Sequence, residues 1–564
     1  MARDPLTSVS TVETPQTRPL PGRAAEQVRN DAGGYGFAKD VWTRLEDFLI
    51  LGTVGGTYYA GEAELTDDNA AVVFDAVEAD GARVVRLATE ISTARPPRAP
   101  KNRPALFALA AAFTFGDPPA RQAAKGALAQ VARTTDHLAS FFGYYKNLGG
   151  KASRSGSGTA PVAGRAARSM FASWFLTGEV DQVAWRVCKA RQRRTPAGEA
   201  FDLRDALRIA HPKADSPARR ALLGWIAGNV TDAEARAQLP AVDAYLTARS
   251  VTTAAEAVRV VRERGVLWEF LPDAVLTDPG VWDALVDTIG MTALIRNLAR
   301  MTRIGTLKPM GDATRRAAAR LTDARALARA RVHPMDLFLA LRVYGSGTAK
   351  PHPRAEEQRW SPVPAVVDAL EEAYELSFGH IEPSGRRLLV AVDSSGSMTF
   401  TKVLSGGSPL GSTYEVANAM AVILNRIEGG GCHVIDVDTG VHASKVTART
   451  NLREIGSWRA SGGGTDLSLP FVYAREERLA VDGVVVLTDN ETWAGQRHPA
   501  QELAAYRRAV NPAVRVVVAA MTPVGHSIAD PRGGGVLNIA GLDASLPMVV
   551  NGFVRRPGEA AETA

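Results

Sequence analysis

The chain has few cysteines and lacks any long uninterrupted run of apolar residues. Its two cysteines, Cys188 and Cys432, are too few for a disulfide framework, and neither lies in a cluster of metal-ligating side chains. Arg, Asp, Gly or Pro interrupts every candidate membrane span, and residues 1–23 lack the apolar core of a signal peptide. These absences predict a cytoplasmic protein that has no membrane partner.

The sequence also lacks the motifs of two common enzyme chemistries. It contains no G-x-x-x-x-G-K-S/T phosphate-binding loop and no H-E-x-x-H zinc motif. The polar cluster described below offers oxygen ligands but no obvious general base. We therefore expect a binding protein and not an enzyme.

Length and charge indicate how the chain is divided. Its 564 residues exceed the size at which one hydrophobic core stops growing, which predicts at least two domains. Residues 1–380 contain 49 Lys and Arg against 42 Asp and Glu, whereas the remainder contains 17 against 18. The positive charge is thus confined to the first part, where it lies in local clusters. This distribution favours a nucleic-acid partner.

The first part has the pattern of many short amphipathic helices separated by Pro, Gly and polar caps. Helices are expected at 105–114, 121–133, 135–147, 164–176, 181–190, 203–210, 217–228, 232–247, 253–263, 280–289, 291–302, 311–330 and 334–343. Because no strict sequence period is present, the pattern predicts an α-solenoid of degenerate, HEAT-like repeats. The Thr/Pro-rich residues 1–22 predict a disordered tail.

The second part contains two apolar strands that each end in a carboxylate. Residues 388–392 lead into Asp393, and residues 484–488 lead into Asp489. The carboxyl ends of parallel strands share one edge of a sheet, where ligands bind in open α/β folds. The loop that carries Asp393 adds serine hydroxyls, and the glycine-rich residues 461–466 bring a threonine hydroxyl. Such hard oxygens suit Mg²⁺, although an ordinary Ser/Gly turn after a strand is the alternative interpretation.

This order of D-x-S-x-S, Gly-Gly-Thr and Thr-Asp resembles a von Willebrand factor A domain with a metal-ion-dependent adhesion site. The resemblance implies a doubly wound α/β, Rossmann-like domain. It also implies that Ser395, Ser397 and Thr465 coordinate a divalent ion, expected to be Mg²⁺, whereas Asp393 and Asp489 act largely through water. An acidic side chain of a partner would complete the coordination.

The first part carries a second resemblance. AGGYGFAKDVWTRLEDFLILGTVGGTYYAGE, RAPKNRPALFALA, KARQRRTPAGEAFDLRDALRIAHPK, MTALIRNLARMT and HPMDLFLALRVYGSG are similar to segments of the TROVE domain. That module is shared by the Ro autoantigen, telomerase-associated and vault proteins. A TROVE domain followed by an A domain is the arrangement of Ro proteins, which implies a helical ring that the A domain closes. The expected domains are tails at 1–22 and 557–564, a ring at 23–370, a connector at 371–384 and an A domain at 385–556.

Basic residues cluster in one of the segments similar to TROVE. The candidate RNA-binding residues are Arg186, Lys189, Arg191, Gln192, Arg193, Arg208, His211 and Lys213. Lys189 and Arg193 are four residues apart and share a helix face, which can hold phosphates. A solvated basic helix face is the alternative interpretation. The Gly/Ser-rich residues 147–170 either extend this basic face or form a flexible insertion.

The resemblance to Ro proteins implies the partners of this surface. It implies binding of Y-like small noncoding RNA and of single-stranded ends of misfolded RNA, with polynucleotide phosphorylase tethered through RNA. We expect a monomer. A competing hypothesis is a protein-interaction scaffold that acts through the A-domain metal site, with RNA binding secondary.

Overall fold

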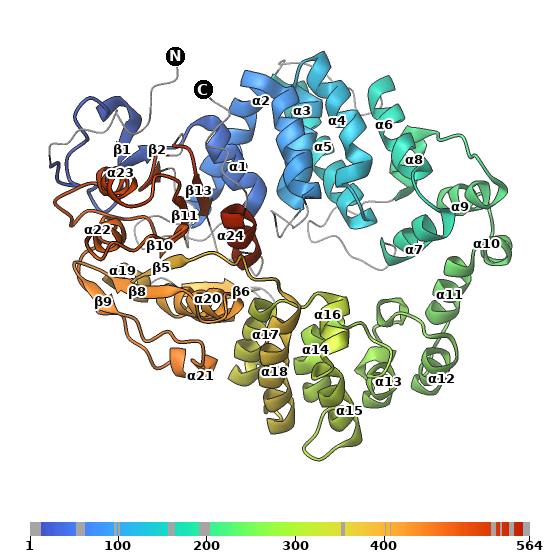
Figure 1. Cartoon of the computed structure of the whole chain (residues 1–564). Helices are drawn as coiled ribbons and strands as arrows, with labels where there is room; N and C mark the ends of the chain where they lie inside the picture. The colour runs from blue at the N-terminus through green and yellow to red at the C-terminus, as the bar shows by residue number, and fades with distance from the viewer. Residues whose placement is uncertain are drawn as a thin grey trace.

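The computed structural model describes residues 13–51, 62–94, 99, 102–155, 164–190, 203–350, 356–400, 402–405, 408–520, 526–530, 533–540 and 546–555. Helices follow one another in an arc, and an α/β domain contacts both ends of that arc (Figure 1). The chain therefore closes on itself as a ring, and the expected combination of a helical solenoid with an α/β domain is confirmed. No helix in these residues is long and apolar enough to cross a bilayer.

The helical arc consists of helices, most of them short, that pack on near neighbours in sequence. Its members are α1 (Val41–Leu51), α2 (Glu62–Thr93), α3 (Arg103–Phe115), α4 (Pro118–Val131), α5 (Thr135–Ser155), α6 (Arg165–Leu176), α7 (Val180–Ala190), α8 (Leu203–Ala210), α9 (Pro217–Ala227), α10 (Asp232–Gln238), α11 (Pro240–Arg249), α12 (Ala254–Arg264), α13 (Pro279–Leu285), α14 (Met291–Arg303), α15 (Asp312–Leu321), α16 (Ala324–Ala330), α17 (Pro334–Ser346) and α18 (Pro364–Ser377). Short pieces between them are η2 (Trp268–Phe270), η3 (Val275–Thr277), η4 (Phe378–His380), β3 (Thr348–Ala349) and β4 (Gln358–Arg359).

Local signals explain where several of these helices begin. Thr231 and Thr253 each accept a hydrogen bond from the backbone of a glutamate three residues later, and that glutamate bonds back, so both form capping boxes. Two expected long helices are each divided in the structure. Pro240 begins α11, and the Asp323 side chain caps α16.

The A domain is a doubly wound sheet. The strand order is β13-β11-β10-β5-β8-β9, in which all neighbours are parallel except β8 and β9. The strands are β5 (Leu388–Asp393), β8 (His433–Val437), β9 (Val441–Ala443), β10 (Gly483–Thr488), β11 (Arg515–Ala520) and β13 (Val536–Ala540). The other elements are α19 (Gly396–Phe400), β6 (Lys402–Ser405), β7 (Ser408–Ser412), α20 (Thr413–Ile427), α21 (Leu452–Ile455), α22 (Leu469–Glu476), α23 (Pro499–Ala509), β12 (His526–Ser527) and α24 (Leu546–Arg555).

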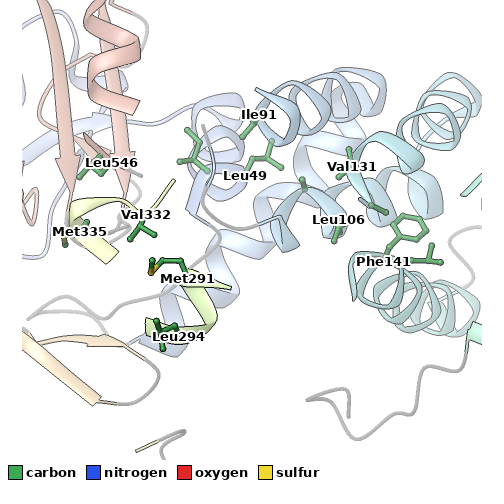
Figure 2. Packing of buried hydrophobic residues seen from close by; sticks show 14 of the residues in the cluster. Leu49, Ile91, Leu106, Val131, Phe141, Met291, Leu294, Val332, Met335 and Leu546 are labelled. Carbon is green, nitrogen blue, oxygen red and sulfur yellow. The ribbon is translucent and has the colours of Figure 1, made fainter. Parts of the chain in front are cut away.

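Both faces of the central strand β5 are buried, which explains its continuous apolar sequence. Val390 and Val392 join a core with α20 and α24, whereas Leu389 and Ala391 join a second core with α22 and α23. The first core continues without a break into the helical arc. Figure 2 shows Leu546 of α24 in this cluster together with Met335 of α17 and Val332 of the link before α17.

The last helices of the arc meet the A domain through ion pairs. Arg342 of α17 pairs with Glu415 of α20, and Arg453 of α21 pairs with Glu371 of α18. At the other end of the arc, α1 contacts β13. The A domain thus joins the first helix of the arc to the last ones.

Two expected boundaries differ from the structure. Helix α18 crosses the expected end of the ring at residue 370 and packs on α15, α16 and α17, so the helical part extends to Ser377. The disordered tail expected at 1–22 is wrong for residues 13–22. Leu20 is buried against Phe37 and Ala500, and residues 1–12 lie outside the described part.

The segment after Leu20 is also part of the A-domain surface. Following η1 (Ala24–Glu26), β1 (Gln27–Arg29) and β2 (Tyr35–Ala38) form a small antiparallel sheet with β12. Although residues 23–38 were expected in the ring, they lie on the A domain and lead directly into α1.

Candidate metal site and basic surface

Three loops meet at the carboxyl edge of the A-domain sheet. Strands β5 and β10 are parallel neighbours, with Val392 in register with Leu487, so their terminal carboxylates lie at one edge. The glycine loop (residues 461–466) is fastened to the loop after β5, because Gly462 N donates to the Ser394 carbonyl (3.1 Å) and Gly396 N donates to the Gly463 carbonyl (3.3 Å). The structure therefore brings the predicted metal residues to one place.

The two strand-end carboxylates are fully buried. Asp393 Oδ1 accepts from Ser395 N (2.9 Å), and its Oδ2 accepts from Thr488 Oγ1 (2.6 Å). Asp489 Oδ1 accepts from Glu491 N (3.2 Å), but its Oδ2 has no hydrogen-bond partner among the residues that the structure describes. Burial, reinforced by the charge of Asp489, raises the pKa of Asp393, and burial raises the pKa of Asp489 as well. Both directions mean that negative charge is costly here without a counter-ion.

The hydroxyl groups around these carboxylates suit a small, hard cation. Ser395 and Thr465 are buried, and Ser395 Oγ lies 3.3 Å from Ser397 Oγ. The Thr465 carbonyl accepts from Trp493 N and Ala494 N, both at 3.0 Å, which ties the glycine loop to the loop after β10. No group of three His, Cys, Asp or Glu gathers within the described part of the chain. A mixed set of hydroxyl and carboxylate oxygens with one unpartnered carboxylate atom fits Mg²⁺.

The described residues of the predicted basic surface lie on two helices and the turn after them. Arg186 and Lys189 are on α7, Arg208 is on α8, and His211 and Lys213 follow α8. Arg186 is half-buried, whereas Lys189, Arg208, His211 and Lys213 are exposed. Both helices pack against α9, although α7 and α8 are not close neighbours of each other. The predicted residues Arg191, Gln192 and Arg193 lie outside the described part.

The basic side chains on this surface form weak ion pairs, in which a phosphate group could replace the carboxylate partner. Lys189 Nζ lies 3.7 Å from Glu269 Oε2, and Arg208 Nη1 lies 3.8 Å from Asp205 Oδ1. All four side chains are partly exposed, and such pairs contribute little stability. His211 ends α8 with a φ of 44°, which turns the chain sharply at the edge of the cluster.

Known proteins resemble this chain over almost its whole length. The sequence matches the TROVE domain over residues 165–354 and the Ro60 vWA domain over residues 387–554. It is 36% identical to RNA-binding protein RO60 of Deinococcus radiodurans over 98% of this chain and 99% of that protein. The chain belongs to the Ro family.

Two further relatives agree with this assignment. RNA-binding protein RO60 of Caenorhabditis elegans is 29% identical, over 94% of this Ro-family chain and 90% of its own length. The crystal structure of the Deinococcus radiodurans RO (RSR) protein superposes with a TM-score of 0.70 at 33% identity, covering 92% of this chain and 99% of that one.

The N-terminal segment of this Ro-family protein supports the metal loops, which the sequence did not reveal. Gln16 is completely buried. Its Nε2 donates to Asp466 Oδ1 (2.7 Å) and its Oε1 accepts from Thr492 Oγ1 (2.6 Å). Asp466 follows the candidate ligand Thr465, and Thr492 lies in the loop after β10. A single glutamine in a Thr/Pro-rich stretch carries no sequence signal for such a role.

Two large aromatic side chains are exposed on the loops around the candidate metal site. Phe400 ends α19, which follows Ser395, and it is 67% exposed. Trp493 lies in the loop after β10 and is 39% exposed. Its ring lies over Gly464, where an added Cβ would come within 2.9 Å of Trp493 Cζ2. In this Ro-family protein, apolar surface therefore flanks the polar site.

Proposed function

We propose that this Ro-family protein binds RNA through its helical ring, taking Y-like small noncoding RNA and the single-stranded ends of misfolded RNA. The observation that carries the proposal is that Lys189 of α7, Arg208 of α8 and the following His211 and Lys213 are all solvent-accessible basic side chains inside the TROVE-matched region. Cations with weak internal pairs can bind phosphates without reading sequence. The relatives that share this architecture are named RNA-binding proteins.

We also propose that the A domain binds Mg²⁺ through Ser395, Ser397 and Thr465, with Asp393 and Asp489 acting largely through water. The unpartnered Asp489 Oδ2 and the costly burial of both carboxylates support this role. The ion would supply a coordination position for a carboxylate of a partner. The role is therefore adhesion, not catalysis.

The remaining parts of the proposal follow from the Ro resemblance. The protein acts as a monomer in the cytoplasm, where bound Y-like RNA tethers polynucleotide phosphorylase and the ring presents RNA for maturation or decay. A second candidate function, a protein-interaction scaffold, is favoured by the exposed Phe400 and Trp493 beside the metal site.

The RNA-binding proposal is tested by replacing three of the predicted RNA-binding residues, two of them with residues of opposite charge. The triple variant Lys189→Glu, Arg193→Glu and His211→Ser should bind a structured small RNA more weakly. Its logarithmic salt dependence should also flatten by about one unit for each phosphate that the variant no longer binds. Filter binding over a range of salt concentrations measures both quantities.

The matched control changes the same charge elsewhere on the arc. Arg259 and Arg262 of α12 are exposed, and changing both to Glu removes equal positive charge. The control should keep most of the affinity. If triple variant and control bind alike, with helicity intact by circular dichroism, the RNA surface lies elsewhere and the scaffold function gains support.

A further inference from the structure

A hollow in the helical arc has no role in the function proposed so far. It has a volume of about 330 Å³ and lies between α14 and α17, bounded by the link from α16 to α17. Its apolar lining includes Ile295, Ala299, Leu339, Ala340 and Val343. These side chains are half-buried, in contrast to the fully buried side chains on the core face of α14, such as Leu294 and Met301. The lining is thus accessible apolar surface.

Two arginines are among the residues that line this hollow. Arg296 of α14 and Arg331 of the α16–α17 link are both exposed. Neither guanidinium has a hydrogen bond or an ion pair to any residue that the structure describes. Arg316 of α15, by contrast, pairs with Asp283.

The backbone holds Arg331 in place at the edge of the hollow. Its φ is 53°, a left-handed conformation that residues with a Cβ adopt at a cost, and its N donates to the Ala328 carbonyl (3.1 Å) as the end of α16. Asp336 of α17 also lines the hollow, and its Oδ2 accepts from His333 N (3.3 Å). The side of the hollow formed by α14 and the α16–α17 link therefore carries two arginines, whereas the side formed by α17 carries a carboxylate acceptor.

We propose that this hollow binds one nucleotide of single-stranded RNA, a site that deepens and rests on the proposed RNA-binding function. The base would contact the apolar side chains of Ile295 and Ala340, and the guanidinium groups of Arg296 and Arg331 would hold an adjoining phosphate. Asp336 would accept a hydrogen bond from a base N–H or a ribose hydroxyl. A combination of cations with an apolar base contact is how single strands are held without pairing.

The size of the hollow favours a nucleotide over a segment of a partner protein. Its volume is at the lower end of the range for small-molecule pockets. A docked helix is about 10 Å across and needs apolar anchors over several turns. The link that carries Arg331 and Val332 lines one side of the hollow. An acidic peptide could contact the same arginines, but most of the peptide would extend beyond the hollow and have no apolar surface to bind.

The test uses a fluorescein-labelled, unstructured oligoribonucleotide of about ten nucleotides and fluorescence anisotropy on the full chain. The double variant Arg296→Ala and Arg331→Ala should weaken binding about tenfold. Alanine keeps the Cβ of Arg331, so the backbone strain is unchanged. Ala340→Leu, which fills the hollow without a change of charge, should weaken binding about fivefold. Arg325→Ala removes an exposed arginine of α16 that does not line the hollow, and it should bind like wild type.

The outcomes separate this site from the function on which it rests. If wild type binds neither the oligonucleotide nor a structured RNA, the proposed function itself has failed. If wild type binds the oligonucleotide and the hollow variants bind it equally well, the nucleotide site is wrong. A labelled Glu/Leu-rich peptide provides a second readout. If the hollow variants bind the oligonucleotide like wild type, and the peptide binds wild type but not Ala340→Leu, the hollow is a protein-docking site and the proposal is overturned. Thermal melts of each variant confirm that the fold is intact.

Discussion

At the scale of single residues, the two buried carboxylates at the ends of β5 and β10 determine the chemistry of the A domain. Each oxygen of Asp393 accepts a hydrogen bond, whereas Asp489 Oδ2 has no hydrogen-bond partner within the described part of the chain. An unpaired buried charge is costly, and a divalent cation would offset that cost. The strand behind Asp393 is apolar on both faces, so the sheet does not depend on this carboxylate.

The first prediction is that Mg²⁺ raises the Tm of the wild-type protein and that Asp393→Ala removes this response. An ion that binds only the folded state stabilises it by about 2.7 kcal/mol at a free concentration roughly 100 times its Kd. Thermal melts during a Mg²⁺ titration measure the shift. Asp436, a buried carboxylate on the neighbouring strand β8, provides the matched control, because Asp436→Ala should keep the response. An equal response in wild type and Asp393→Ala would exclude Asp393 from the metal site.

At the scale of elements, the helices with a clear apolar period could be predicted from sequence to within a few residues. Helix α8 was expected at 203–210 and lies there, because its apolar residues recur at helical spacing and charged residues occupy the opposite face. The long helix α2 was not predicted. It is kinked at Asp80, and the adjacent Gly81 permits close packing, because an added Cβ would lie 2.7 Å from Ala120 Cβ. That reason is tertiary and has no local sequence pattern.

The candidate site shows the same division between local and long-range information. The proximity of the candidate metal residues could be predicted because each lies in a short motif at the end of a strand or in a glycine loop. Gln16 could not be, since its partners Asp466 and Thr492 are more than 400 residues away in the chain. The hollow between α14 and α17 was not predicted either, because it forms only when two helices with separate apolar patterns pack together.

The second prediction concerns this N-terminal element. Gln16→Leu leaves the Thr492 hydroxyl and the Asp466 carboxylate without their glutamine partner, which should destabilise the A domain by about 2 kcal/mol. Because both partners lie in loops of the metal site, the variant should also need more Mg²⁺ for half of the maximal Tm increase. Thr17→Leu changes the adjacent, exposed residue and should behave like wild type. A lower Tm for Gln16→Leu with unchanged Mg²⁺ dependence would limit Gln16 to a structural role.

At the scale of the whole molecule, the A domain joins the two ends of the helical arc (Figure 1). Residues 13–38 lie on the A domain, and the chain then enters α1, so the first and last segments of the sequence are structurally adjacent. One hydrophobic core continues from the arc into the A domain. This arrangement separates the two proposed binding regions, a basic surface on the arc and an oxygen-rich site on the A domain.

The central claim is that RNA is held by the helical arc and not by the A domain. Ultraviolet crosslinking of the purified full chain to a structured small RNA, followed by mass spectrometry of the crosslinked peptides, tests it most directly. The account predicts crosslinks within residues 186–213, and these crosslinks should persist in Asp393→Ala. Crosslinks confined to residues 388–555, or their loss in a folded Asp393→Ala protein, would contradict this division of function.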